Sequence, residues 1–91
     1  MAEVLDAAAL VAYAEGSVVS RALIHRDTGS ATLFAFDKGE SLSEHSAPFD
    51  ALVHVLDGEA EISVGGVSHR VKAGQMILMP SGVPHALKAV E

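Results

Sequence analysis

The sequence contains no cysteine and no tryptophan, and it has few basic residues. Without cysteine the chain cannot form a disulfide, a cysteine-ligated zinc site or a thiol nucleophile. Six Lys and Arg against twelve Asp and Glu give a net charge of −6. This charge disfavours binding to nucleic acid or to an anionic membrane, because both attract positive surfaces. We therefore expect the partner to be a small organic molecule or a second copy of the chain.

The chain also lacks a long apolar run and a basic leader. Its first 14 residues are partly apolar but include Glu3 and Asp6, so they predict neither a signal peptide nor a membrane span. The default expectation is a protein of the cytoplasm. A chain of 91 residues can form one domain with a modest core. Because aromatic residues make up only 4% of the chain, that core should be aliphatic.

The hydrophobic pattern predicts a short N-terminal helix followed by strands. Apolar residues recur at helical spacing within residues 1–16, and Gly16 offers a left-handed end to the helix. From residue 17 to residue 91, short apolar runs alternate with turn residues, and Asp57-Gly58 and Gly65-Gly66 are two-residue hairpin signals. Roughly seven or eight short strands at such spacing predict an antiparallel sandwich or barrel. We therefore predict an all-β domain over residues 17–91.

Two glycine-led motifs each place one histidine at a fixed offset from a glycine. In the first motif, five residues separate Gly39 from His45, and Gly58 follows later. The second motif runs from Gly74 to His85. Each motif reads as a turn that delivers an imidazole onto a strand, so the two histidines can meet inside one cavity if their strands pack together.

These motifs resemble the two motifs of the cupin superfamily, and the resemblance spans roughly residues 30–90. The second motif matches in every spacing, at Gly74, Pro80, Gly82 and His85. The resemblance implies a small single-domain cupin, which is an antiparallel jelly-roll barrel that is commonly dimeric. It also implies that a metal, when present, is held by two histidines and a glutamate from the first motif and by one histidine from the second.

The metal positions are only half matched. His45 and His85 stand where the resemblance requires histidines, but Ala47 stands at the second histidine position and Ala51 at the glutamate position. An alanine methyl group donates no lone pair, so two protein ligands remain, whereas catalytic zinc sites usually keep three. We expect either no metal or a weakly bound divalent ion such as Zn, Mn, Ni or Fe. His69, on the predicted apolar face of its strand, is a further candidate ligand, although a structural role is the commoner reading of such a histidine.

Two functions follow from this pattern. The first is a small-molecule binding or sensing module, in which the two alanines enlarge an apolar cavity. The second is a cupin enzyme of the dioxygenase, isomerase or decarboxylase type, with His45 and His85 holding a weakly bound metal or serving as general acid and base. The two missing ligands, and the lack of any visible nucleophile or carboxylate dyad, favour the binding module. A purely structural role stays open. The residues expected to line the cavity are Ala47, Phe49, Ala51, Val53, Met76 and Leu87.

The end of the sequence leaves a predicted sheet edge open. The chain stops six residues after His85, where the resemblance implies another strand. Because an unpaired edge promotes association, we expect the edge to be covered by a partner subunit, by the N-terminal strand or by a longer native chain. A homodimer interface should be apolar and should include the early strands around Val18, Val19 and Leu23.

Overall fold

The computed structural model describes residues 2–90, which form eight strands and one 3₁₀ turn, η1 (Ala7–Ala9). Every strand pair is antiparallel, which confirms the predicted all-β class. No helix within this range is long or apolar enough to cross a membrane. The strands are β1 (Val18–Arg26), β2 (Gly29–Phe36), β3 (Ser41–His45), β4 (Ala51–His54), β5 (Glu59–Val64), β6 (Val67–Lys72), β7 (Met76–Met79) and β8 (His85–Ala89).

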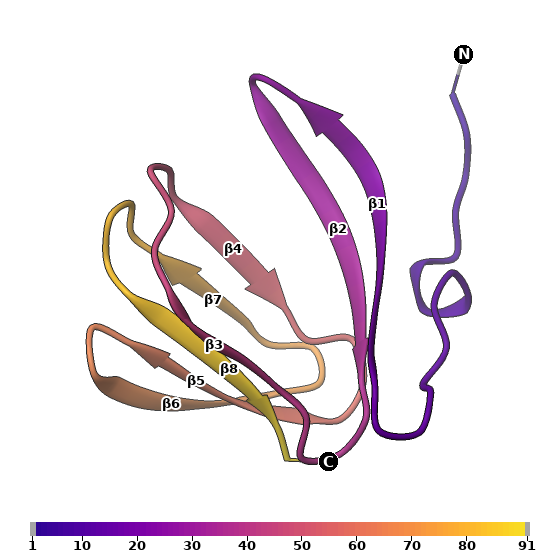
Figure 1. The fold of residues 1–91 in the computed structure, drawn as a ribbon. Helices are drawn as coiled ribbons and strands as arrows, with labels where there is room; N and C mark the ends of the chain where they lie inside the picture. Colours follow the sequence, from indigo (N-terminus) through magenta and orange to yellow (C-terminus); the bar gives the residue numbers. More distant parts are fainter. Residues whose placement is uncertain (1, 91) are drawn as a thin grey trace.

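The strands form one four-stranded sheet, in the order β3-β8-β5-β6, and two two-stranded sheets, β1-β2 and β4-β7. Figure 1 shows the β4-β7 pair beside the four-stranded sheet, with the β1-β2 hairpin rising away from both. The N-terminal segment lies beside this hairpin. The barrel is therefore closed on one side by the four-stranded sheet and left open between β2 and β4.

The core lies between the four-stranded sheet and the β4-β7 pair, and it is aliphatic as predicted. Ile62 of β5 is fully buried, and it packs with Val71 of β6 and Met79 of β7. In β5 the neighbouring Glu61 is exposed, so this strand has the one dry and one wet face that its alternating sequence predicts. The residues around this cluster are Ala51, Val53, Val55, Ala60, Val64, Ile77 and Leu87.

The Gly65-Gly66 turn confirms the hairpin predicted between β5 and β6. Both glycines have positive φ angles, 57° and 82°, as a two-residue type I′ turn requires. A Cβ atom at Gly65 would come within 3.3 Å of a Val83 side-chain carbon, so this turn packs tightly against the loop that precedes β8. The turn therefore helps to fix the position at which β8 begins.

The predicted N-terminal helix is limited to the η1 turn. Asp6 has an extended backbone and forms no side-chain capping hydrogen bond. Val4 is 99% exposed and Leu5 is 47% exposed, so the expected apolar face finds no core against which to pack. Because isolated short helices are marginal in water and depend on such packing, the helical spacing alone does not produce a helix here. The prediction of a helix over residues 1–16 is wrong beyond this turn, and residue 1 lies outside the described residues.

Candidate functional site

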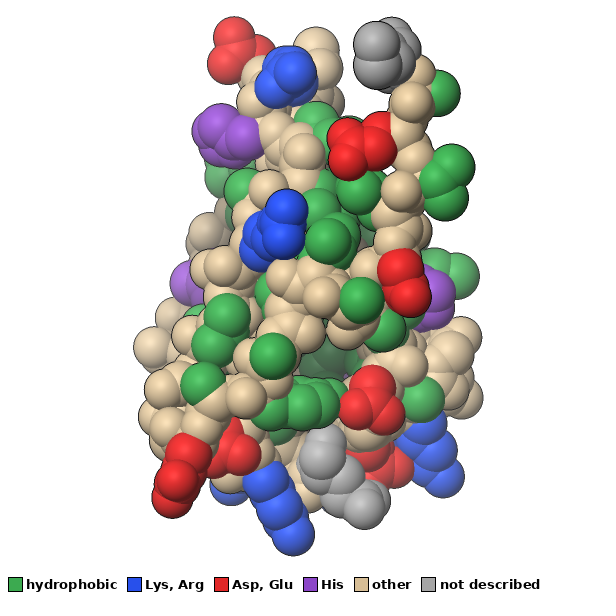
Figure 2. Space-filling view, turned by 90° about the vertical axis from the view of Figure 1, so that its right-hand side faces the viewer, with side chains coloured by type: hydrophobic (Ala, Val, Ile, Leu, Met, Phe, Trp, Pro, Cys, Tyr) green, Lys and Arg blue, Asp and Glu red, His purple; other side chains and the backbone are tan. Residues whose placement is uncertain are grey.

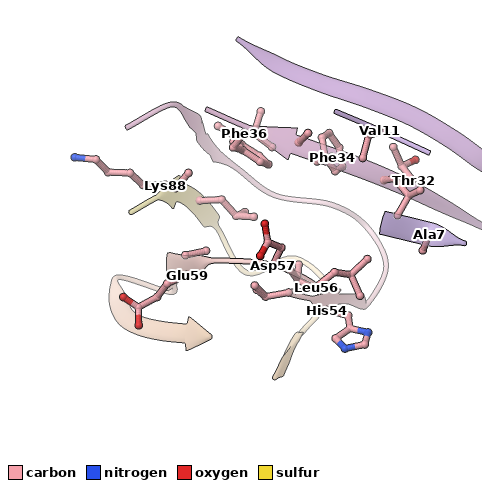
Figure 3. A pocket seen from close by; sticks show the side chains of 18 of the residues that line it. Ala7, Val11, Thr32, Phe34, Phe36, His54, Leu56, Asp57, Glu59 and Lys88 are labelled. Atoms are coloured by element: carbon pink, nitrogen blue, oxygen red, sulfur yellow. The ribbon is translucent and has the colours of Figure 1, made fainter. Parts of the chain in front are cut away.

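A hollow of about 580 Å³ lies between the β1-β2 hairpin, the N-terminal segment and the barrel. Figure 3 shows Phe34 and Phe36 of β2 on one side of it, and Leu56 and Asp57, which follow β4, on the other. The two phenylalanine rings lie 5.8 Å apart, centroid to centroid. Most of the lining is apolar, so the hollow is suited to the apolar part of an organic molecule.

His45 and His85 meet at this hollow, and both contribute to its lining. They are register partners in the antiparallel pair of β3 and β8, and their Nε2 atoms are 3.0 Å apart. The rings contact edge to face, with centroids 4.3 Å apart and planes at 72°. His85 is buried at 5% exposure, whereas His45 is exposed. The structure thus joins two imidazoles that are 40 residues apart in the sequence.

The outer nitrogens of the two rings both lie near backbone carbonyl groups. His45 Nδ1 is 2.9 Å from the carbonyl oxygen of Ser43, and His85 Nδ1 is 3.3 Å from that of Val83. Because a carbonyl oxygen only accepts, a ring that carries its hydrogen on Nδ1 donates to its carbonyl group, whereas the contact between the two Nε2 atoms is a hydrogen bond when one of them carries the hydrogen. Each ring thus has a partner on both of its nitrogens.

Cross-links between two loops hold these histidines in place. The backbone N–H of Gly82 donates to the carbonyl oxygen of Ala47, and the N–H of Ser81 donates to the Asp50 carboxylate, both at 2.8 Å. Residues 46–50 follow His45, and residues 80–84 precede His85. The loop that leaves one histidine is therefore hydrogen-bonded to the loop that leads to the other.

The donor set does not fit a tightly held metal. Within residues 2–90, no group of three or more His, Asp or Glu side chains could hold a metal ion. Ala47 and Ala51, at the positions where the family pattern has ligands, are both half-buried, and Ala51 pairs with Met79 and packs against the core. Two imidazole nitrogens alone fall short of the three protein ligands that catalytic zinc sites usually keep.

His69 does not join the two paired histidines. It lies opposite Ile62 in the β5-β6 register but is exposed, and it borders a separate depression beside Met76 and Gln75. The prediction that His69 lies on an apolar face of its strand is wrong, because β6 is an edge strand and its side chains are mostly exposed. Only Val71 of β6 is buried, and Val67 is 59% exposed.

The predicted cavity residues divide into three groups. Val53 of β4 and Leu87 of β8 line the hollow together with the paired histidines. Phe49 and Met76 are 61% and 58% exposed and do not contribute to its lining. Met76 pairs with His54 at the end of a strand pair whose inward positions are taken by Ile77 and Met79. The two remaining predicted residues, which pack beside the hollow or lie in the adjoining loop, are Ala47 and Ala51.

The sequence pattern gave no sign that the hairpin and the N-terminal segment form one wall of the hollow. Phe34 and Phe36 occupy alternate positions in a predicted strand. Which residues face them across the hollow depends on how the strands are arranged in the folded chain, and the sequence pattern does not show this. The hydroxyl of Tyr13 donates to the Asp57 carboxylate at 2.8 Å, although 44 residues separate them. This bond holds the N-terminal segment to the turn after β4, and both residues line the hollow.

The Tyr13–Asp57 bond can be measured directly, because Tyr13 is the only tyrosine and the chain has no tryptophan. The hydrogen bond to Asp57, followed by burial and the carboxylate charge, raises the pKa of Tyr13 above its usual 10.0. The neutral phenol is favoured in the folded state, so its stabilising contribution is complete below pH 10.0 and is lost as pH rises through the raised pKa. An ultraviolet titration of the native chain should show phenolate forming above pH 10.0.

The matched control for this titration is Asp57→Asn, which removes the charge but keeps the shape. In this variant the midpoint should fall back toward 10.0. Identical midpoints in the two proteins would show that Tyr13 does not donate to Asp57 in solution.

The strand order and the paired histidines define a small antiparallel jelly-roll barrel. The family model for the cupin domain matches residues 32–91, and the chain belongs to the cupin family. A solved structure of the conserved SPY1581 protein of unknown function, from Streptococcus pyogenes, is 44% identical. It superposes with a TM-score of 0.93 over 100% of this chain and 80% of that one.

Two further solved structures are similar. A Cupin 2 conserved barrel domain protein from Leptotrichia buccalis is 44% identical, with a TM-score of 0.89 over 91% of this chain and 40% of that one. A cupin superfamily protein from Desulfitobacterium hafniense is 30% identical, with a TM-score of 0.90 over 98% of this chain and 82% of that one. A search of curated proteins gives no significant match.

Proposed function

We propose that this cupin barrel binds a small organic molecule in the hollow, with the His45–His85 pair as its polar anchor and without a tightly held metal. The observation that carries the proposal is the convergence of two imidazoles, 3.0 Å apart, at an otherwise apolar hollow of about 580 Å³. This volume lies within the range of roughly 300–1,000 Å³ typical of small-molecule sites, which combine apolar walls with few polar groups.

The lining indicates what kind of molecule fits. Phe34, Phe36 and Met79 offer apolar contact for a ring or a branched chain. The histidine pair offers nitrogen atoms to a polar group at one end, and it is the site's most buried polar feature because His85 is only 5% exposed. A compact organic molecule with one hydrogen-bonding end matches this arrangement.

A second function is favoured by one specific observation. Metal-binding histidines usually donate their other ring N–H to a carbonyl or carboxylate group, and the Nδ1 atoms of His45 and His85 both lie near carbonyl oxygens. A cupin enzyme in which this pair weakly holds a divalent ion, or moves a proton as general acid and base, is therefore the alternative. Because the donor set is two nitrogens, the binding module is the better supported of the two.

The proposal is tested by ligand-induced thermal stabilisation and calorimetry with a panel of small organic molecules. A ligand at a hundred times its Kd stabilises the fold by about 2.7 kcal/mol, and this stabilisation should be lost in His45→Ala and His85→Ala. His69→Ala is the matched control, because His69 is exposed and lies away from the hollow, and it should bind as the native chain does. One retained metal ion per native chain, lost in both site variants, would instead establish the metalloenzyme.

We also propose that the chain acts as a homodimer in the cytoplasm, without a nucleic-acid partner. The net charge of −6 supports the exclusion of nucleic acid, because non-specific binding to phosphates depends on positive charge.

A further inference from the structure

Two hydrogen bonds tie the N-terminal segment to opposite borders of the open side of the barrel. The backbone N–H of Gly16 donates to the Asp37 carboxylate at 2.7 Å, and Asp37 directly follows β2. The hydroxyl of Tyr13 donates to the carboxylate of Asp57, which lies between β4 and β5. Because β2 and β4 border the opening and do not pair with each other, the segment that carries both donors spans the opening.

The same segment forms part of the wall of the hollow. Four of its residues line the hollow together with β2 and β4, and they are Ala7, Ala8, Val11 and Tyr13. Figure 2, in which this side of the molecule faces the viewer, shows apolar side chains between the segment and the hairpin. Since residues 7–16 cover one side of the hollow, we name them the lid segment.

Few contacts hold the lid segment in place. None of its residues is buried, and only Ala7, Leu10 and Val11 are half-buried. Small side chains bury little apolar area, and hydrophobic stabilisation is proportional to that area. Among the described residues before Gly16, only Tyr13 hydrogen-bonds to the barrel, because the other hydrogen bonds lie within η1 and the turn at residues 14–17. Segments with so few buried contacts open locally at low cost.

Gly16 is suited to act as the hinge of the lid segment. Its φ angle is 66°, in the left-handed region that glycine adopts without strain. Apart from its chain neighbours, no heavy atom lies within 4 Å of the place where a Cβ atom would stand. The start of β1 is fixed independently, because the N–H of Asp37 donates to the carbonyl oxygen of Ser17 at 3.0 Å. The lid segment can therefore turn at Gly16 while the hairpin stays in place.

We propose that the lid segment gates the hollow, with Gly16 as the hinge and the Tyr13–Asp57 hydrogen bond as the contact that holds it closed. A hydrogen bond to a charged group changes an equilibrium constant by about tenfold or more. Because Tyr13 is 57% exposed, solvent reduces this factor to about fivefold. Loss of the bond should therefore raise the population of the open state about fivefold. Opening needs no ligand, whereas entry of a ligand by this route rests on the proposed function.

Thiol labelling tests the opening without any ligand, because the chain has no cysteine of its own. Ala35 of β2 lines the hollow and is 5% exposed, so Ala35→Cys places a thiol that iodoacetamide reaches when the hollow opens. Adding Tyr13→Phe, which removes only the hydroxyl, should speed labelling about fivefold. Asp57→Asn in the same background should also speed it. Glu15→Gln is the matched control, because Glu15 is an exposed residue of the lid segment, and it should label at the unmodified rate.

Circular dichroism checks that each variant is folded. Labelling through the lid should change little with low concentrations of urea, because global unfolding exposes much more surface than movement of one segment. Equal labelling rates with and without the Tyr13 hydroxyl would overturn the proposal. Equal acceleration by Glu15→Gln would also overturn it, because the Tyr13–Asp57 bond would then not be the contact that holds the lid.

Entry into the hollow is tested with N-phenylnaphthylamine, an apolar dye that becomes fluorescent in apolar sites. In stopped-flow mixing, Tyr13→Phe should speed association and dissociation alike, about fivefold, with Kd nearly unchanged, because a gate acts in both directions. A change confined to dissociation is typical of a residue that only contacts the ligand, and it would overturn the gating role. A native chain that binds no dye would count against the proposed function, while faster thiol labelling in Tyr13→Phe would uphold the lid.

Discussion

A double variant, Ala47→His with Ala51→Glu, is expected to retain one divalent ion per chain, whereas we expect the native sequence to hold metal weakly or not at all. The two changes add an imidazole and a carboxylate at the positions where the cupin pattern has ligands. Two nitrogen donors already face each other at 3.0 Å, and Ala51 pairs with Met79, which lines the hollow. Raising the set from two protein donors to four should tighten binding by about a thousandfold, on the order of 4 kcal/mol.

The measurement is dialysis against Zn²⁺ or Mn²⁺, followed by elemental analysis and calorimetric titration. Ala47→His with Ala51→Gln is the matched control, because the glutamine amide has the size of glutamate without its charge, and it should bind more weakly. Adding His85→Ala to the double variant should abolish retention. If the native chain already retains one ion per copy as tightly as the double variant does, the missing-ligand argument fails.

Ile62→Ala is expected to destabilise the fold more than any substitution on the surface. Ile62 is 0% exposed at the centre of the core, and replacing a buried isoleucine by alanine costs about 2–5 kcal/mol. Small domains have a total stability of about 5–15 kcal/mol, so much of it would be lost. Ile62 also pairs with Leu87 of β8, the strand that begins with His85, so the variant should bind ligand poorly under conditions where it is partly unfolded.

Urea unfolding followed by circular dichroism measures this effect as a lower midpoint. Val67→Ala is the matched control, because Val67 is 59% exposed, and it should change the free energy of unfolding by no more than about 0.5 kcal/mol. Equal midpoints for the two variants would show that the described core does not carry the stability.

The sequence predicted the parts of the fold that depend on local pattern. Alternation in β5 predicted its buried and exposed faces, and Gly65-Gly66 predicted the turn, because both signals act between neighbouring residues. The spacing of the two motifs correctly predicted that the side chains of His45 and His85 would lie at the same cavity. The register of β3 with β8 then brings the rings into contact.

The failures depend on contacts that no local pattern encodes. Residues 1–16 have helical spacing, but within the described part Val4 and Leu5 find no core against which to pack, and only η1 forms. His69 alternates with apolar neighbours, yet its place on an edge strand leaves it exposed. The wall formed by Phe34, Phe36 and Tyr13 could not be predicted, because the hairpin approaches β4 only in the folded chain.

The hydrogen bonds between the loop after His45 and the loop before His85 have a further consequence. Because Ala47 and Asp50 are tied to Gly82 and Ser81, neither imidazole can shift far without moving the other. The histidine pair is preorganised, so little conformational entropy of its side chains is lost when a ligand binds. Recognition here should therefore discriminate by shape, and molecules that require the two rings to separate should be rejected.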